Sequence, residues 1–164
     1  MISGLAPKIS GQKTEQKHGF LQFSQKTDYG LFLLMELAKN QVQKNQLSKV
    51  TGAEPLSLRN FAEKNGMSFF FMQKVAFELR KAGLVTADRG KNGGYVLAKS
   101  ADEITLKEII EVLEGPVSVM HCLGSETLMT CSRQPTCQMR HGLGTVNKAI
   151  VNIFTQTTLS HLFQ

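Results

Sequence analysis

One stretch of this sequence, residues 57–97, decides the fold that we expect: SLRNFAEKNGMSFFFMQKVAFELRKAGLVTADRGKNGGYVL. Ser57 and Ser68 are good helix N-caps, because a serine hydroxyl accepts a hydrogen bond from a free N–H of the first turn. The first capped helix ends near Gly66, and the second runs from Ser68 to Gly83. Two capped helices joined by a short turn that contains glycine predict a helix-turn-helix.

The pattern changes from helix to strand after Gly83. Residues 84–86 and 95–97 are short apolar runs, and they flank the glycine-rich segment 89–94. Glycine permits the positive φ that a tight reversal needs. A two-stranded wing directly after the second helix predicts a mainly α fold of the winged helix-turn-helix type.

A further helix is expected before this unit, over residues 24–39, followed by a polar loop over residues 40–52. The helix is apolar on nearly every side, so we expect it to be buried against more than one neighbour. Its apolar residues are Phe32, Leu33, Leu34, Met35, Leu37 and Ala38.

Two more helices are expected after the wing. Thr105 and Glu108 form a capping box that opens a helix ending at residues 115–116, Gly-Pro. The last helix is long, and its apolar residues alternate in steps of four and three, which is typical of a coiled-coil seam. These residues are Met139, Leu143, Val146, Ile150 and Ile153. The pattern predicts a dimerisation helix and a homodimer; the alternative is a helix that packs only on its own subunit.

Three segments follow from these patterns: a disordered extension over residues 1–20, a winged helix-turn-helix DNA-binding domain over 21–100, and a cysteine-loop sensor and dimerisation region over 101–164. The first twenty residues lack the apolar core and cleavage pattern of a secretory signal. No apolar run approaches the length of a membrane span. We therefore expect a cytoplasmic protein without a membrane partner.

The charge distribution favours double-stranded DNA as a partner. The net charge is +6, and residues 56–99 hold eight lysines and arginines against three acidic residues. A helix fits the major groove, where Gln73 has the geometry to read adenine. The other DNA-binding candidates are Arg59, Ser68, Phe70, Lys74, Arg80, Lys81 and, in the wing, Arg89 and Lys91. The alternative is a solvated basic helix beside an ordinary hairpin.

The roles that we expect for these residues differ. Lys74, Arg80 and Lys81 would grip phosphates, whereas Arg89 would enter a narrow minor groove. Two adjacent aromatic residues, Phe69 and Phe70, fit this surface less well, because exposed aromatic rings are costly. The alternative is that one of them closes the core.

Three cysteines fall within sixteen residues of the C-terminal region: Cys122, Cys131 and Cys137. An odd number without an export signal argues for reduced thiols rather than disulfides. Soft thiolates suit iron–sulfur clusters, zinc and Cu(I). The cysteines are separated by eight and by five residues, so they lack the closely spaced pairs that are typical of a zinc site. This wide spacing favours a larger cluster. The alternative is three unrelated surface thiols.

Three segments resemble one known family, the IscR/NsrR (Rrf) family of iron–sulfur regulators. They are KTDYG at 26–30, LRKAGLV at 79–85 and RGKNGGY at 89–95, and the resemblance extends over residues 21–163. It implies a homodimeric transcription regulator with a [2Fe-2S] or [4Fe-4S] cluster near the dimer interface. LEGP at 113–116 and VNKAI at 146–150 look most like the branch that regulates the SUF cluster-assembly operon.

The resemblance also implies a fourth ligand. In part of the family it is an aspartate at the start of the first helix of the partner subunit, and Asp28 occupies the matching position. In the IscR branch it is a histidine three residues after the last cysteine. Arg140 stands there in this sequence, and His141 follows it. Asp28 is therefore favoured, with His141 as the possible alternative.

The expected function is a DNA-binding repressor that senses iron–sulfur cluster or redox status and controls SUF- or ISC-type cluster-assembly genes. A nitric oxide- or iron-responsive repressor of the same family is an alternative, as is a zinc- or iron–sulfur-binding adaptor that no longer binds DNA. An enzyme is not expected. The cysteines and neighbouring histidines have no orienting carboxylate nearby, and the sequence has no phosphate-binding loop or nucleophile elbow.

Overall fold

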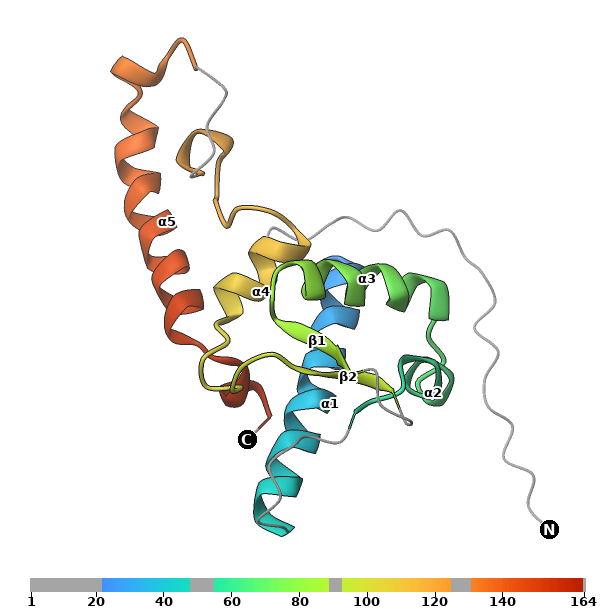
Figure 1. The fold of residues 1–164 in the computed structure, drawn as a ribbon. Helices are drawn as coiled ribbons and strands as arrows, with labels where there is room; N and C mark the ends of the chain where they lie inside the picture. The colour runs from blue at the N-terminus through green and yellow to red at the C-terminus, as the bar shows by residue number, and fades with distance from the viewer. Residues whose placement is uncertain (1–21, 48–54, 89–92, 125–130, 164) are drawn as a thin grey trace, which may run out of the picture.

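The computed structural model describes residues 22–47, 55–88, 93–124 and 131–163, so the extension expected over residues 1–20 lies outside the described residues. The described chain is mainly helical with one two-stranded sheet, as predicted (Figure 1). In chain order its elements are α1 (Gln25–Leu47), α2 (Leu58–Lys64), α3 (Phe69–Lys81), β1 (Val85–Asp88), β2 (Gly94–Leu97), α4 (Leu106–Leu113), the 3-10 turns η1 (His121–Leu123) and η2 (Gln134–Thr136), α5 (Gln138–Gln156) and the 3-10 turn η3 (Leu159–Leu162).

The predicted helix-turn-helix is present as α2 and α3. Ser57 Oγ accepts a hydrogen bond from the backbone N–H of Asn60, and Ser68 Oγ accepts one from the N–H of Phe71, both at 3.4 Å. Gly66 lies between the helices with φ +64°, which only glycine adopts without strain. The buried residues of the pair are Leu58, Phe61 and Ala62 of α2, and Met72, Val75, Ala76 and Leu79 of α3.

The wing pairs β1 with β2 in antiparallel register, from Val85 opposite Leu97 to Asp88 opposite Gly94. The wing tip lies outside the described residues. Leu56, just before α2, adds a bridge: its N–H and carbonyl each bond to the backbone of Tyr95 at 2.9 Å. A Cβ on Gly94 would lie 2.6 Å from the Leu56 carbonyl oxygen, so this close approach requires glycine.

Helix α1 is buried against several neighbours, as predicted, and packs on α3, α4, β2 and η3. It passes behind α3 and the wing in Figure 1. Leu33, Leu34 and Leu37 are fully or almost fully buried, whereas Phe32 keeps 46% of its surface exposed. A Cβ on Gly30 would collide with the Leu113 side chain of α4, so the glycine allows the two helices to touch.

The loop expected from residue 40 is partly wrong, because α1 continues to Leu47. The polar composition of this stretch suggested a loop. No glycine or proline occurs between Gly30 and Gly52, however, so nothing in the sequence interrupts the backbone hydrogen bonds of the helix. Residues 48–52 of the expected loop lie outside the described residues.

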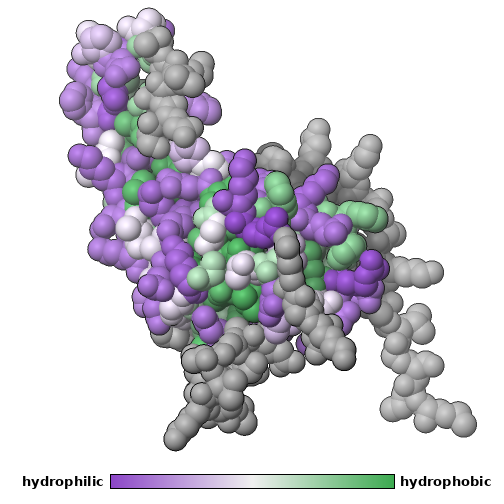
Figure 2. Space-filling view, in the orientation of Figure 1, coloured by the Kyte–Doolittle hydropathy of each residue, from purple (hydrophilic) through white to green (hydrophobic). Residues whose placement is uncertain are grey.

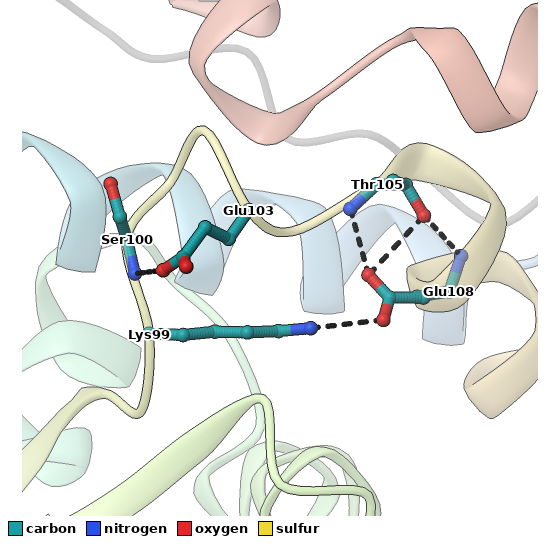
Figure 3. A network of polar contacts seen from close by, with 5 residues as sticks. All are labelled: Lys99, Ser100, Glu103, Thr105 and Glu108. Carbon is teal, nitrogen blue, oxygen red and sulfur yellow. Dashed lines mark hydrogen bonds and ion pairs between the residues drawn. The ribbon is translucent and has the colours of Figure 1, made fainter.

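The predicted capping box opens α4 and joins it to the wing (Figure 3). The Thr105 hydroxyl accepts a hydrogen bond from Glu108 N–H at 3.2 Å, and the Glu108 carboxylate accepts one from Thr105 N–H at 2.9 Å. Lys99, just after β2, forms an ion pair with Glu108 at 2.9 Å. Between them, the backbone N–H of Ser100 donates to Glu103 at 2.9 Å. These contacts fix the direction in which α4 leaves the wing.

Helix α5 is the long C-terminal helix that the sequence predicted. Its N-terminal half stands beside the body rather than on it, and its C-terminal end returns to the body near η3 (Figure 1). Leu159 of η3 is fully buried, so the final turn packs on the core as predicted. Within the part of the chain that the structure describes, no helix is long and apolar enough to cross a membrane.

Candidate nucleic-acid interface and metal centre

The outer face of α3 is an exposed surface opposite its buried stripe. Its residues are Phe70, Gln73, Lys74, Phe77, Arg80 and Lys81, all exposed. Over α3, Figure 2 shows hydrophobic side chains standing among hydrophilic ones. Five of these six are predicted DNA-binding residues, and the structure brings them together on one face. The sixth, Phe77, was expected to face away from the core stripe like the others but was not assigned a DNA contact; it lies two turns from Phe70.

Within this face the residues have different positions. At 3.6 residues per turn, Phe70, Phe77 and Lys81 point almost directly away from the buried stripe, with Lys74 close beside them. Gln73 lies on one flank of this row. The centre of the surface is therefore formed by two aromatic rings and two lysines, and the residue predicted to read adenine lies next to it.

Phe69 and Phe70 have different surroundings. Phe69 is half-buried and packs against the core, whereas Phe70 is 77% exposed. The guanidinium of Arg59, on α2, lies 4.6 Å from the centre of the Phe69 ring, a cation–π contact. The alternative that one of the two phenylalanines closes the core therefore holds for Phe69.

The positions of Ser68, Arg89 and Lys91, the remaining DNA-binding candidates, say less about DNA binding. The Ser68 side chain caps α3, so its position is explained by helix formation. The single acidic residue of α3, Glu78, forms an ion pair with Lys26 of α1 at 3.1 Å. That pair lowers the negative charge beside the basic face. Arg89 and Lys91 fall outside the described residues.

The three cysteines lie in the connection between α4 and α5. Cys122 is in η1 and half-buried, Cys131 is exposed, and Cys137 is half-buried directly before α5. None of them forms a disulfide. Turn η1 packs against α5, and the backbone N–H of Val119 donates to the Asn147 side chain at 2.9 Å. The first part of the connection is thus attached to α5.

The donor chemistry fits a metal or cluster, because three accessible thiols are concentrated in one connection. Among the described residues, no three cysteine, histidine or acidic side chains lie together as a metal site. Residues 125–130, between the first two cysteines, are not described. Asp28 is exposed in the first turn of α1, and His141 is exposed in the first turn of α5. The described part of the chain therefore supplies three thiols but shows no complete ligand set.

The start of α1 is tied to the end of α4 through Glu114. Its carboxylate accepts hydrogen bonds from the Thr27 hydroxyl at 2.6 Å and from the Ser24 N–H at 2.9 Å. Thr27 is fully buried. Partial burial raises the pKa of Glu114, but these hydrogen bonds and the nearby charge of Lys26 outweigh it and lower the pKa below its usual value. Asp28 is thus held at a fixed place beside the origin of the cysteine connection.

The fold and the basic outer face of α3 define a winged helix-turn-helix protein of the DNA-binding type. Residues 23–164 match the family model of Rrf2, described as an iron-dependent transcriptional regulator. The chain belongs to the Rrf2 family of transcriptional regulators. The predicted family is therefore confirmed, and so is the expectation that the protein is not an enzyme, because its relatives are named as regulators.

Individual relatives carry different regulatory names. The chain is 40% identical over 106 residues to the HTH-type transcriptional regulator CymR of Bacillus subtilis, covering 65% of this chain and 70% of the relative. The solved CymR structure, titled the global cysteine regulator, superposes with a TM-score of 0.64 at 34% identity, over 87% of this chain and 96% of that one. NsrR of Halalkalibacterium halodurans is 32% identical over 142 residues, 87% and 90% of the two chains.

A third relative is IscR. The T. potens IscR structure has a TM-score of 0.60 at 29% identity and covers 87% of this chain and 85% of that one. The names IscR, NsrR and CymR thus occur together among the relatives. The chain is thus a transcriptional regulator of a family whose members carry several regulatory names.

The tie at Glu114 gives a testable pH dependence. Glu114→Gln is expected to lower the free energy of unfolding by about 1 kcal/mol near neutral pH, since the carboxylate is partly exposed and its charge-assisted hydrogen bonds are weakened by solvent. Because the folded-state pKa is lowered, this contribution is present above the usual carboxyl pKa and is lost as the pH falls through the folded-state value. Urea denaturation at a series of pH values measures it.

The matched control is Glu63→Gln, at an exposed carboxylate of α2. It is expected to change the unfolding free energy little at any pH. An equal loss for the two variants, or a loss at Glu114 that does not vary with pH, would contradict the proposed tie.

Proposed function

We propose that this protein is a homodimeric repressor that binds a double-stranded DNA operator and responds to an iron–sulfur cluster held by its three cysteines. Residues 21–100 form the DNA-binding domain, and residues 101–164 form the sensing and dimerisation region. The observation that carries the proposal is the basic outer face of α3, beside a wing, in a chain of the Rrf2 family.

DNA binding is assigned to α3, the N-terminus of α2 and the wing. Lys74, Arg80 and Lys81 contact phosphates, which gives affinity without much sequence information. Gln73 reads an adenine edge from the flank of α3. The remaining contacts are assigned to Arg59, Ser68, Phe70, Arg89 and Lys91. In this arrangement α3 enters the major groove while the wing reaches the adjacent minor groove.

Salt dependence tests the DNA-binding assignment. Lys74→Gln and Lys81→Gln are each expected to weaken binding to random-sequence duplex DNA and to reduce the slope of log K against log salt by about 1, since each removes one phosphate contact. Fluorescence anisotropy over a salt series measures both. Lys107→Gln is the control, because Lys107 pairs with Glu111 on α4 at 2.7 Å. A wild-type affinity that does not change with salt would favour the adaptor alternative.

Dimerisation is assigned to α5. The five apolar residues of the predicted seam fall into two groups in the structure. Leu143 and Ile150 are half-buried on their own chain. Met139, Val146 and Ile153 are exposed, with 62%, 46% and 58% of their surface accessible. These three residues are spaced by seven and form one row along the helix. A second copy of α5 would cover this row, since a row at heptad spacing is complementary to itself.

A charge in this row tests the dimer. Val146→Glu is expected to convert the dimer to a monomer, because it would bury a carboxylate without a partner between two helices. Size-exclusion chromatography with light scattering measures the mass. Asn152→Glu, at an exposed position of the same helix outside the row, is expected to remain dimeric. A wild-type monomer at micromolar concentration would contradict the assignment.

The cluster ligands are assigned to Cys122, Cys131 and Cys137, with Asp28 of the partner subunit as the fourth and His141 as the alternative. When bound, an iron–sulfur cluster supplies a centre that can be oxidised or lost. The chain itself contributes the position of the ligands. Its thiols lie between α4, whose end is tied to α1 by Glu114, and α5, which carries the dimer row.

Binding all three cysteines together restricts the path between α4 and α5. The conformation of this connection determines the orientation of α5 relative to the rest of the chain. In a dimer held together by α5, that orientation determines the distance between the two α3 helices. A ligand shifts such an equilibrium only by its different affinity for the two arrangements. Operator affinity therefore depends on whether the three cysteines are held together.

Anaerobic purification tests the cluster. The wild-type protein is expected to be coloured and to contain iron and sulfide, and Cys122→Ala, Cys131→Ala or Cys137→Ala is expected to remove both. Asp28→Ala should weaken cluster retention, whereas His141→Ala and the control His121→Ala should not. Absorption spectra with iron and sulfide assays measure these outcomes. A colourless protein with one zinc per chain would contradict the cluster while leaving DNA binding intact.

A second candidate function has its own support. The 40% identity to CymR, whose structure is titled the global cysteine regulator, favours a regulator of cysteine-related genes rather than of SUF- or ISC-type genes. The family description as an iron-dependent transcriptional regulator favours an iron-responsive repressor in the same way. Operator affinity that is the same in the triple Cys→Ala variant and in reconstituted protein would select a mechanism without a cluster.

A further inference from the structure

The centre of the α3 surface is unusual for a basic face, because it is apolar. Phe70 is 77% exposed and Phe77 is 59% exposed. They are seven residues apart, so their side chains leave the helix in nearly the same direction. Each is followed four residues later by a lysine, Lys74 and Lys81, which lie beside the rings.

Within the described chain these rings remain uncovered. The ring of Phe70 approaches that of Phe69 at 6.0 Å between centres, and Phe77 has no ring neighbour among the described residues. Exposing two large aromatic side chains to water costs free energy, so their natural environment is a surface that covers them. Because Lys74 and Lys81 are positively charged and the rings are apolar, the covering surface should be apolar at its centre and negatively charged around it. The major groove of DNA meets both conditions, because phosphates flank the methyl groups of thymine.

We propose that Phe70 and Phe77 determine operator specificity by packing against the C5-methyl groups of two thymines in the major groove. The proposal rests on the DNA binding proposed above. Thymine is the only base that presents a methyl group there, so an apolar contact distinguishes it from the other three bases. Phe77 thereby becomes a specificity-determining residue, and Gln73 reads a neighbouring base from the flank of the row.

Helix geometry sets the spacing of the two thymines. Seven residues at 1.5 Å each separate Phe70 and Phe77 by about 10.5 Å along the helix axis. Base pairs rise about 3.4 Å each, so this distance corresponds to about three base-pair steps. Each half-site of the operator should therefore contain two thymines about three base pairs apart, facing the same groove.

Removing single methyl groups from the DNA tests the proposal. An operator is first selected from random-sequence duplexes with the full-length wild-type protein, and each thymine is then replaced by deoxyuridine. Replacement at two positions about three base pairs apart is expected to weaken wild-type binding by about fourfold each, the factor expected for one buried methyl group. Fluorescence anisotropy at fixed salt measures the affinities.

The protein variants connect each methyl group to one ring. Phe70→Ala should abolish the effect of deoxyuridine at one of the two positions, and Phe77→Ala should abolish it at the other. Phe77→Leu keeps an apolar contact and should retain part of the effect. Gln73→Ala is the control and should leave both deoxyuridine effects unchanged. Circular dichroism verifies that each variant is folded.

The outcomes separate this proposal from the proposed function. Salt-dependent binding to random-sequence DNA without any deoxyuridine effect would overturn the thymine contacts alone. Deoxyuridine effects that persist in both alanine variants would overturn them as well. Unchanged operator selectivity in those variants would assign the two rings to a protein partner instead. A wild-type protein that does not bind DNA would refute the proposed function itself.

Discussion

The contact between α1 and α4 at Gly30 is the constraint on which the rest of this structure depends. The Leu113 side chain occupies the space where a Cβ of residue 30 would lie, and Val75 of α3 lies 3.4 Å from the same point. Helix α1 therefore supports both the helix assigned to DNA binding and the helix that leads to the cysteines. Because these three helices share one buried core, a change in position of one must be accommodated by the others.

The first turn of α1 extends this arrangement through three consecutive residues. Lys26 pairs with Glu78 of α3, Thr27 donates to Glu114 at the end of α4, and Asp28 faces outward. The surface proposed to read DNA, the start of the cysteine connection and the proposed fourth ligand are thus fixed to one turn of helix. Polar contacts at such a place favour a defined geometry more than they add stability, since partly exposed pairs contribute little net free energy.

The sequence predicted those features that depend on local chemistry. The caps at Ser57 and Ser68 and the capping box at Thr105 were predicted, because each is a hydrogen bond between near neighbours. The extension of α1 to Leu47 was missed because polarity was taken as a sign of a loop. The different burial of Phe69 and Phe70 depends on the packing of α2 against α3. This tertiary contact cannot be inferred from two identical neighbouring residues in the sequence. The cysteines were found as candidates, but spacing along the chain does not determine where a fourth ligand comes from.

The proposed cluster ligands and the exposed apolar row of α5 are adjacent in the chain, since Cys137 directly precedes α5 and Met139 lies in its first turn. Within the described residues no complete ligand set forms, while Met139, Val146 and Ile153 present apolar surface outward. If a second chain covers that row and also brings its Asp28 to the thiols, association and cluster binding become linked, and each strengthens the other by the same factor. Such linkage would account for the position of the thiols beside α5, the proposed dimer helix, and outside the proposed DNA-binding domain. A cluster enclosed by one chain would gain nothing from that position.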